Sequence, residues 1–81
     1  MQTVTVYSTP NCSRCKVTYM ALDRAGVPYT PVDVSQDEGA RAYVEDLGYT
    51  EAPVVVVDDD NHWSGYRPEQ IARVARALAS E

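Results

Sequence analysis

The chain has 81 residues, 44% of them hydrophobic, and a formal net charge of −5. This length permits one domain, residues 1–81, with a small core, and the composition excludes a disordered tail. The longest unbroken apolar run, residues 54–57, is far shorter than the ~20 residues that a membrane-spanning helix needs. The first residues lack the basic stretch and apolar core of a secretory signal, so we expect a cytoplasmic protein that does not bind membranes.

The charge is unevenly distributed along the chain. Residues 33–60 hold nine acids against Arg41, a net charge of −8, whereas residues 1–32 carry +2 and residues 61–81 carry +1. Nucleic-acid binding needs a basic face, so this balance excludes it. The bases Arg14, Lys16 and Arg67 are expected to lie together near the reactive residues described below.

The first half of the chain alternates between strand and helix signals. Residues 2–7 alternate apolar and polar side chains, which predicts a strand. Residues 15–25 repeat apolar side chains at helical spacing, and Gly26 is placed to end that helix. Residues 28–34 predict a second strand. The pair Ser35 and Glu38 matches a capping box, which predicts the start of a second helix there.

The second half completes an α/β pattern. Residues 53–57 are apolar on both faces, which is typical of a central strand covered on both sides. Residues 58–61 predict a tight turn leading to a short edge strand over 62–64. Pro68 stands at the first position of a last helix. The order β-α-β-α-β-β-α predicts a four-stranded mixed sheet with three helices, its first two strands parallel and its last two antiparallel.

The two cysteines, Cys12 and Cys15, are spaced Cys-x-x-Cys. A secreted disulfide scaffold of this size would use four or more cysteines. A zinc site would need four ligands, and only His62 and carboxylates could complete it. A redox-active dithiol is the interpretation that fits the position of the pair, between a strand and a helix. A metal-binding module and a pair of inert buried cysteines are the alternatives.

The start of a helix favours thiolate chemistry at Cys12. Backbone N–H groups there lack intrahelical partners and the helix dipole is positive, which lowers the pKa of a thiol. Arg14 and Lys16 act in the same direction if their side chains turn toward the sulfur. Cys12 is therefore expected to be the nucleophile and Cys15, one turn deeper, the resolving thiol.

Three motifs together resemble the NrdH-type redoxins, which are glutaredoxin-like proteins of the thioredoxin superfamily. The motifs are Cys12-x-x-Cys15, the dipeptide Ala52-Pro53, and Trp-Ser-Gly-Tyr-Arg-Pro over residues 63–68. The resemblance covers essentially the whole chain. Two departures stand out: the family usually has an apolar residue and Gln where this chain has Ser13 and Arg14, and usually Phe where this chain has Tyr66.

The resemblance implies a thioredoxin-like or glutaredoxin-like fold and a thiol-disulfide oxidoreductase with no bound cofactor or metal. It implies that thioredoxin reductase reduces a redox-active disulfide between Cys12 and Cys15. The dithiol would then reduce the large subunit of a class Ib ribonucleotide reductase. It also implies a cis peptide bond before Pro53, with the Ala52 backbone pairing an extended segment of the partner.

The roles of other residues stay open at this stage. Trp63 and Tyr66 could dock a partner or pack the corner before the last helix. Arg67 could bond loop carbonyls, the role we favour, or recognise a partner carboxylate. His62 is expected to be a solvated turn residue without a role. A monomer is expected because no apolar surface stretch remains after the core faces are assigned.

Two other functions compete with that of an electron carrier. A glutathione-dependent glutaredoxin would have Thr-Val where Glu51-Ala52 precede Pro53 in this chain, and a Gly-Gly segment in place of residues 63–65. A non-catalytic adaptor that binds a partner in only one thiol state would have the same sequence features, and only turnover with a reductase separates it from a carrier.

Overall fold

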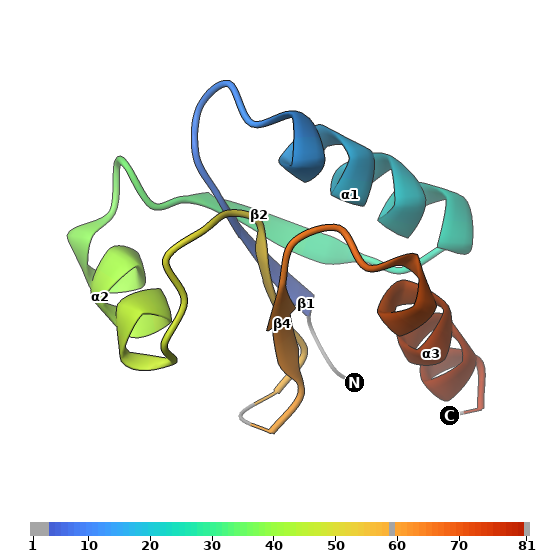
Figure 1. Ribbon diagram of the computed structural model, residues 1–81. Coiled ribbons are helices and arrows are strands. Elements are labelled where there is room, and N and C mark those ends of the chain that lie inside the picture. Colours follow the sequence, from blue (N-terminus) through green and yellow to red (C-terminus); the bar gives the residue numbers. More distant parts are fainter. Residues whose placement is uncertain (1–3, 59, 81) are drawn as a thin grey trace.

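The computed structural model describes residues 4–58 and 60–80 (Figure 1). The first residues of the predicted strand over 2–7, and Asp59 of the predicted turn, lie outside the described residues. The elements appear in the predicted order, which confirms the β-α-β-α-β-β-α fold class. They are β1 (Val4–Ser8), α1 (Ser13–Ala25), β2 (Tyr29–Asp33), α2 (Glu38–Asp46), β3 (Val54–Val56), β4 (His62–Ser64) and α3 (Pro68–Ala79).

The four strands form one mixed sheet in the order β2-β1-β3-β4. β1 and β2 are parallel, with Val6 opposite Pro31, as expected for strands joined by a helix. β3 is antiparallel to β1, and β4 is antiparallel to β3, with Val55 opposite Trp63. The predicted strand directions are therefore confirmed, and β1 and β3 form the centre of the sheet.

Helices cover both faces of the sheet, α1 and α3 on one and α2 on the other (Figure 1). All three residues of β3 are buried, which confirms the predicted central strand. Successive strand side chains point to opposite faces, so β3 supplies both cores. The core on the α1 and α3 face contains Val4, Val6, Leu22, Val27, Val55, Trp63, Ile71 and Val74. The core on the α2 face contains Val44, Val54 and Val56.

The helix ends follow local chemistry, with one correction. Gly26 ends α1 in the left-handed conformation (φ 73°), as predicted. The predicted capping box at Ser35 is wrong: Asp37 is the N-cap of α2, and its Oδ1 accepts the Ala40 N–H at 2.9 Å. Ser35 instead donates its backbone N–H and its hydroxyl to Asp33 Oδ1 at 2.9 and 2.6 Å, which closes the turn after β2.

None of the helices in the described part of the chain combines the length and apolar character needed to cross a membrane.

Candidate redox site

The two cysteines lie at the junction between β1 and α1. β1 ends at Ser8, and Asn11 adopts a left-handed backbone conformation (φ 59°) directly before Cys12. Asn tolerates this conformation better than most residues. Asn11 therefore suits the sharp turn that leads into the helix.

Cys12 is the N-cap residue of α1 and is joined to Cys15 by a disulfide. The Cys12 Sγ accepts the Cys15 N–H at 3.1 Å. Cys12 is partly exposed, whereas Cys15 is only 2% exposed. The first turn of α1 contains no acidic residue that would oppose a negative charge on the sulfur. A disulfide with one accessible sulfur at a helix N-terminus can accept two electrons from a partner's thiol pair, and the dithiol that results can donate two electrons to a partner's disulfide.

The segment before β3 carries the second predicted feature. The peptide bond between Ala52 and Pro53 is cis, as the resemblance predicts. Pro53 is buried, and its carbonyl accepts the Gly65 N–H at 2.8 Å. Among residues 4–58 and 60–80, neither the N–H nor the C=O of Ala52 makes a turn or loop hydrogen bond.

Arg14 links α1 to this segment. Its Nη1 lies 3.7 Å from Oε2 of Glu51, and the two side chains are 66% and 73% exposed. The charge of Arg14 is therefore paired with a carboxylate that no sequence motif places there. Arg14 and Arg67 do line one shallow hollow, together with residues 64–66 and Glu69, whereas Lys16 is exposed on α1 outside it.

The segment over residues 63–68 is divided between core and surface. Trp63 is 5% exposed and belongs to the core under α1 and α3, so packing rather than exposed docking describes its side chain. Tyr66 is 42% exposed. No hydrogen bond joins the Arg67 side chain to a loop carbonyl among residues 4–58 and 60–80, so its favoured role stays a prediction. Within the described residues its side chain meets Glu69 Oε1 at 4.0 Å, and its backbone carbonyl accepts the N–H groups of Gln70 and Ile71.

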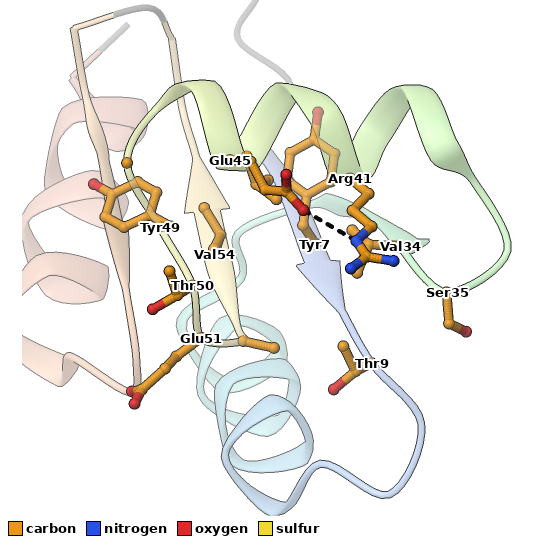
Figure 2. A pocket seen from close by; sticks show the side chains of 13 residues that line it. Tyr7, Thr9, Val34, Ser35, Arg41, Glu45, Tyr49, Thr50, Glu51 and Val54 are labelled. Atoms are coloured by element: carbon orange, nitrogen blue, oxygen red, sulfur yellow. Dashed lines mark hydrogen bonds and ion pairs between the residues drawn. The ribbon is translucent and has the colours of Figure 1, made fainter.

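A larger groove lies between α2 and the sheet (Figure 2). It has a volume of about 660 Å³ and reaches from Tyr7 on β1 to Ala52. Tyr7 packs against Tyr43 with the ring centroids 5.7 Å apart and is a half-buried strand aromatic. Burial, followed by the nearby Tyr43 and Asp37, raises the pKa of Tyr7 above its usual value.

His62 differs from its predicted role as a solvated turn residue. It lies in β4, is half-buried, and its Nδ1 is 2.7 Å from the Tyr49 hydroxyl. The two rings pack edge to face. Tyr49 is thirteen residues away in the chain, so local sequence patterns could not show this pair.

The acidic residues beside His62 form a turn. Asp58 accepts hydrogen bonds from the backbone of Asp60 and from the backbone and side chain of Asn61. These bonds, chiefly the one from the Asn61 side chain, lower the pKa of Asp58. Across residues 4–58 and 60–80, no three His, Cys, Asp or Glu side chains are grouped so that they could hold a metal ion.

Comparison with known proteins identifies the family of the chain. The glutaredoxin family matches residues 4–63. The Gene 56 protein of Mycobacterium phage D29 is 36% identical over 69 residues, which are 84% of this chain and 77% of that protein. The glutaredoxin-like protein NrdH of Lactococcus lactis subsp. cremoris is 32% identical over 72 residues, 89% of this chain and 99% of that protein.

The structure of the NrdH-redoxin from Escherichia coli superposes with a TM-score of 0.83 at 29% sequence identity, covering 89% of this chain and 93% of that one. The fold, the Cys12–Cys15 pair and these relatives confirm the resemblance. The chain therefore belongs to the glutaredoxin family, among the NrdH-type glutaredoxin-like proteins, and is a thiol-disulfide oxidoreductase.

Proposed function

We propose that this protein is a cytoplasmic dithiol electron carrier. It takes electrons from NADPH through a thioredoxin reductase and passes them to protein disulfides, foremost the large subunit of a class Ib ribonucleotide reductase. The observation that carries the proposal is the placement of an accessible Cys12 sulfur at the N-cap of α1, beside a buried Cys15. The E. coli relative is described as having a thioredoxin-like activity profile, which supports this choice of reductase.

The first step is nucleophilic attack by the Cys12 thiolate. It forms a bond to one sulfur of the partner's disulfide, and the partner's other sulfur leaves as a thiolate. The Cys15 N–H, 3.1 Å from Sγ in the oxidised protein, and the positive end of the α1 dipole favour the charged form of Cys12. The N–H group and the positive helix end both lie in the first turn of α1, so the Cys-x-x-Cys motif itself favours the Cys12 thiolate.

The second step releases the reduced partner. The Cys15 thiolate attacks the Cys12 sulfur, the mixed disulfide breaks, and the partner leaves with two thiols while the Cys12–Cys15 disulfide forms. The burial of Cys15 keeps external disulfides from reaching it first. The reductase then returns two electrons and completes the cycle.

The partner is oriented by the segment at Ala52. An extended segment beside the reacting disulfide can pair with the Ala52 N–H and C=O in the manner of an added strand. The exposed ion pair from Glu51 to Arg14 joins this segment to the first turn of α1. Trp63 and Arg67 act on binding indirectly, through the core packing and the helix start at α3 that position the neighbouring loop.

Disulfide reduction driven by NADPH tests the proposal when it is run with two reductants. We expect turnover through thioredoxin reductase and little turnover through glutathione with glutathione reductase. The reverse result would make the protein a glutathione-dependent glutaredoxin, and no turnover with either would leave a redox-sensing adaptor. With an active reductase, the large subunit of a class Ib ribonucleotide reductase is the acceptor to test.

Trapping tests the roles of the two cysteines. Cys15→Ser should accumulate a mixed disulfide with the partner at Cys12, because the second step is blocked. Cys12→Ser should accumulate none, because Cys15 is buried. A mixed disulfide on Cys15 in the second variant would show that the roles are reversed.

A further inference from the structure

The groove between α2 and the sheet reaches two segments that adjoin the redox site. Ala52, whose backbone is proposed to pair with the partner, forms part of its wall, as does Thr9 in the loop that leads to Cys12. A partner segment aligned at Ala52 therefore has this groove on one side of it. The volume of about 660 Å³ lies within the range of sites that bind ligands.

The floor of the groove is apolar. Val44 from α2 and Val54 from β3 are buried there, and Tyr49 is half-buried beside them. All three belong to the core cluster on the α2 face. An apolar floor in a groove that reaches Ala52 favours a partner that brings an apolar side chain.

The rim of the groove is acidic. Figure 2 shows Glu45 and Arg41 on α2 and Glu51 on the segment before β3. The lining thus has two carboxylates and one guanidinium, and Arg41 Nε is already bound to Glu45 at 3.0 Å. The groove also lies largely within residues 33–60, whose net charge is −8. A cation on the partner is complementary to this rim, whereas a carboxylate is repelled.

The intramolecular partner of Glu51 is easily displaced. Arg14 meets it at 3.7 Å, and both side chains are largely exposed. Exposed pairs of this kind contribute little stability. A lysine or arginine of the partner can therefore replace Arg14 at Glu51 without a large cost.

We propose that this groove binds the polypeptide segment next to the partner's disulfide, with an apolar side chain on the Val44–Tyr49–Val54 floor and a lysine or arginine at Glu51. This inference rests on the proposed function and adds the chemistry by which a partner is selected. The hollow on the other side, at Arg14 and Arg67, is the competing place for the same segment.

Peptide disulfides test the charge preference. Peptides with one Cys-x-x-Cys disulfide and a flanking leucine differ only in a neighbouring Lys, Gln or Glu, placed before the cysteines in one series and after them in a second. We expect kcat/KM to fall from Lys to Gln to Glu in one series, by about two- to fivefold at each step, as exposed pairs allow. Glu51→Gln should lower the Lys-to-Glu ratio, whereas Asp46→Asn, a neutralised exposed acid of α2 outside the groove, should leave it unchanged. Equal ratios in the wild type and Glu51→Gln would overturn the preference.

Nuclear magnetic resonance tests the location. Cys15→Ser is trapped in one sample with the Lys peptide and in a control sample with a small uncharged thiol. We expect the peptide adduct to shift amide signals of α2 and of residues 49–52 further than the small-thiol adduct does. Shifts confined to residues 64–69 would place the segment in the other hollow and overturn the proposal. Reduction of a small uncharged disulfide by the wild-type protein is measured in parallel. If the wild type does not reduce it, the proposed function is refuted. If it does, but the peptide adduct shifts no signals on α2, only the proposed groove is refuted.

Discussion

We expect the ion pair between Arg14 and Glu51 to control how much positive charge is available to the Cys12 sulfur. Arg14 lies two residues after Cys12, in the first turn of α1, and its guanidinium is directed at Glu51. Glu51→Gln frees the guanidinium, which should lower the pKa of the Cys12 thiol. Arg14→Gln removes the cation and leaves the carboxylate of Glu51 uncompensated, which should raise that pKa.

The distance and exposure of the pair bound the size of the effect. Two unit charges 3.7 Å apart in water attract by about 1 kcal/mol, and exposed pairs typically contribute about 0.2–1 kcal/mol. In the wild type, Arg14 must give up this energy before it can serve the thiolate, and Glu51→Gln removes that cost. The pKa of Cys12 should therefore fall by about 0.1–0.7.

The reduction potential should follow the thiolate. A lower pKa stabilises the dithiol and raises the potential, here by about 4–20 mV in Glu51→Gln, while Arg14→Gln should be more reducing than the wild type. The double variant should lie close to the wild type, because both charges are gone. The differences should collapse in about 1 M salt, where exposed charges are screened.

Two measurements check these directions. The pH dependence of alkylation in a Cys15→Ser background gives the pKa of Cys12, and a redox titration of the complete dithiol gives the potential. Arg24→Gln, in the last turn of α1, removes an equal charge far from the sulfur and should change neither. The reasoning is refuted if both single variants move the pKa in the same direction, or if Arg24→Gln moves it as far as Arg14→Gln.

Three further predictions concern stability. Asp37→Ala removes the α2 cap and should lower the free energy of unfolding by about 0.5–2 kcal/mol, so Tm should fall by about 4–8 °C per kcal/mol. Ser35→Ala should lower it less. An equal loss in the two variants would support Ser35 as the cap instead of Asp37. Hydrogen bonds hold the pKa of Asp58 below its ordinary value of 3.8. The contribution of Asp58 to stability is therefore present above that value and is lost as the pH falls through the folded-state pKa. Asp58→Ala should lower Tm at neutral pH more than in acid, and a Tm difference from wild type that does not change with pH would contradict this. Leu22→Ala, at a fully buried position, should cost about 2–5 kcal/mol, and a chemical denaturation midpoint unchanged from wild type would refute that packing.

The fold was predictable because its signals are local and periodic. The alternation in β1, the apolar run of β3 and Pro68 at the start of α3 each specify an element independently of the rest of the chain. The residue at which α2 starts was not predictable, because Ser35 and Asp37 are both good N-cap residues. Ser35 is bound to Asp33 in the turn after β2, so Asp37 caps the helix.

The residues of the site also differ in whether local sequence could predict them. Cys12 and Cys15 interact within one helical turn, so their spacing, together with their place between a strand and a helix, favoured a redox-active pair. Glu51 reaches Arg14 across 37 positions of the chain, and Tyr49 reaches His62 across thirteen. Such contacts depend on how β3 and its preceding segment are set against α1 and β4. No motif or periodicity encodes that arrangement.

Glu51 joins two properties of a redoxin that could otherwise vary separately. Through its ion pair with Arg14 it is expected to limit the positive charge available to Cys12, and in the groove it supplies the carboxylate proposed to select basic partners. A substitution that neutralises Glu51 would therefore make the groove more tolerant of acidic partners and, at the same time, make the couple less reducing. A change of partner at this position carries a change of potential with it, and restoring the potential requires a second change at Arg14.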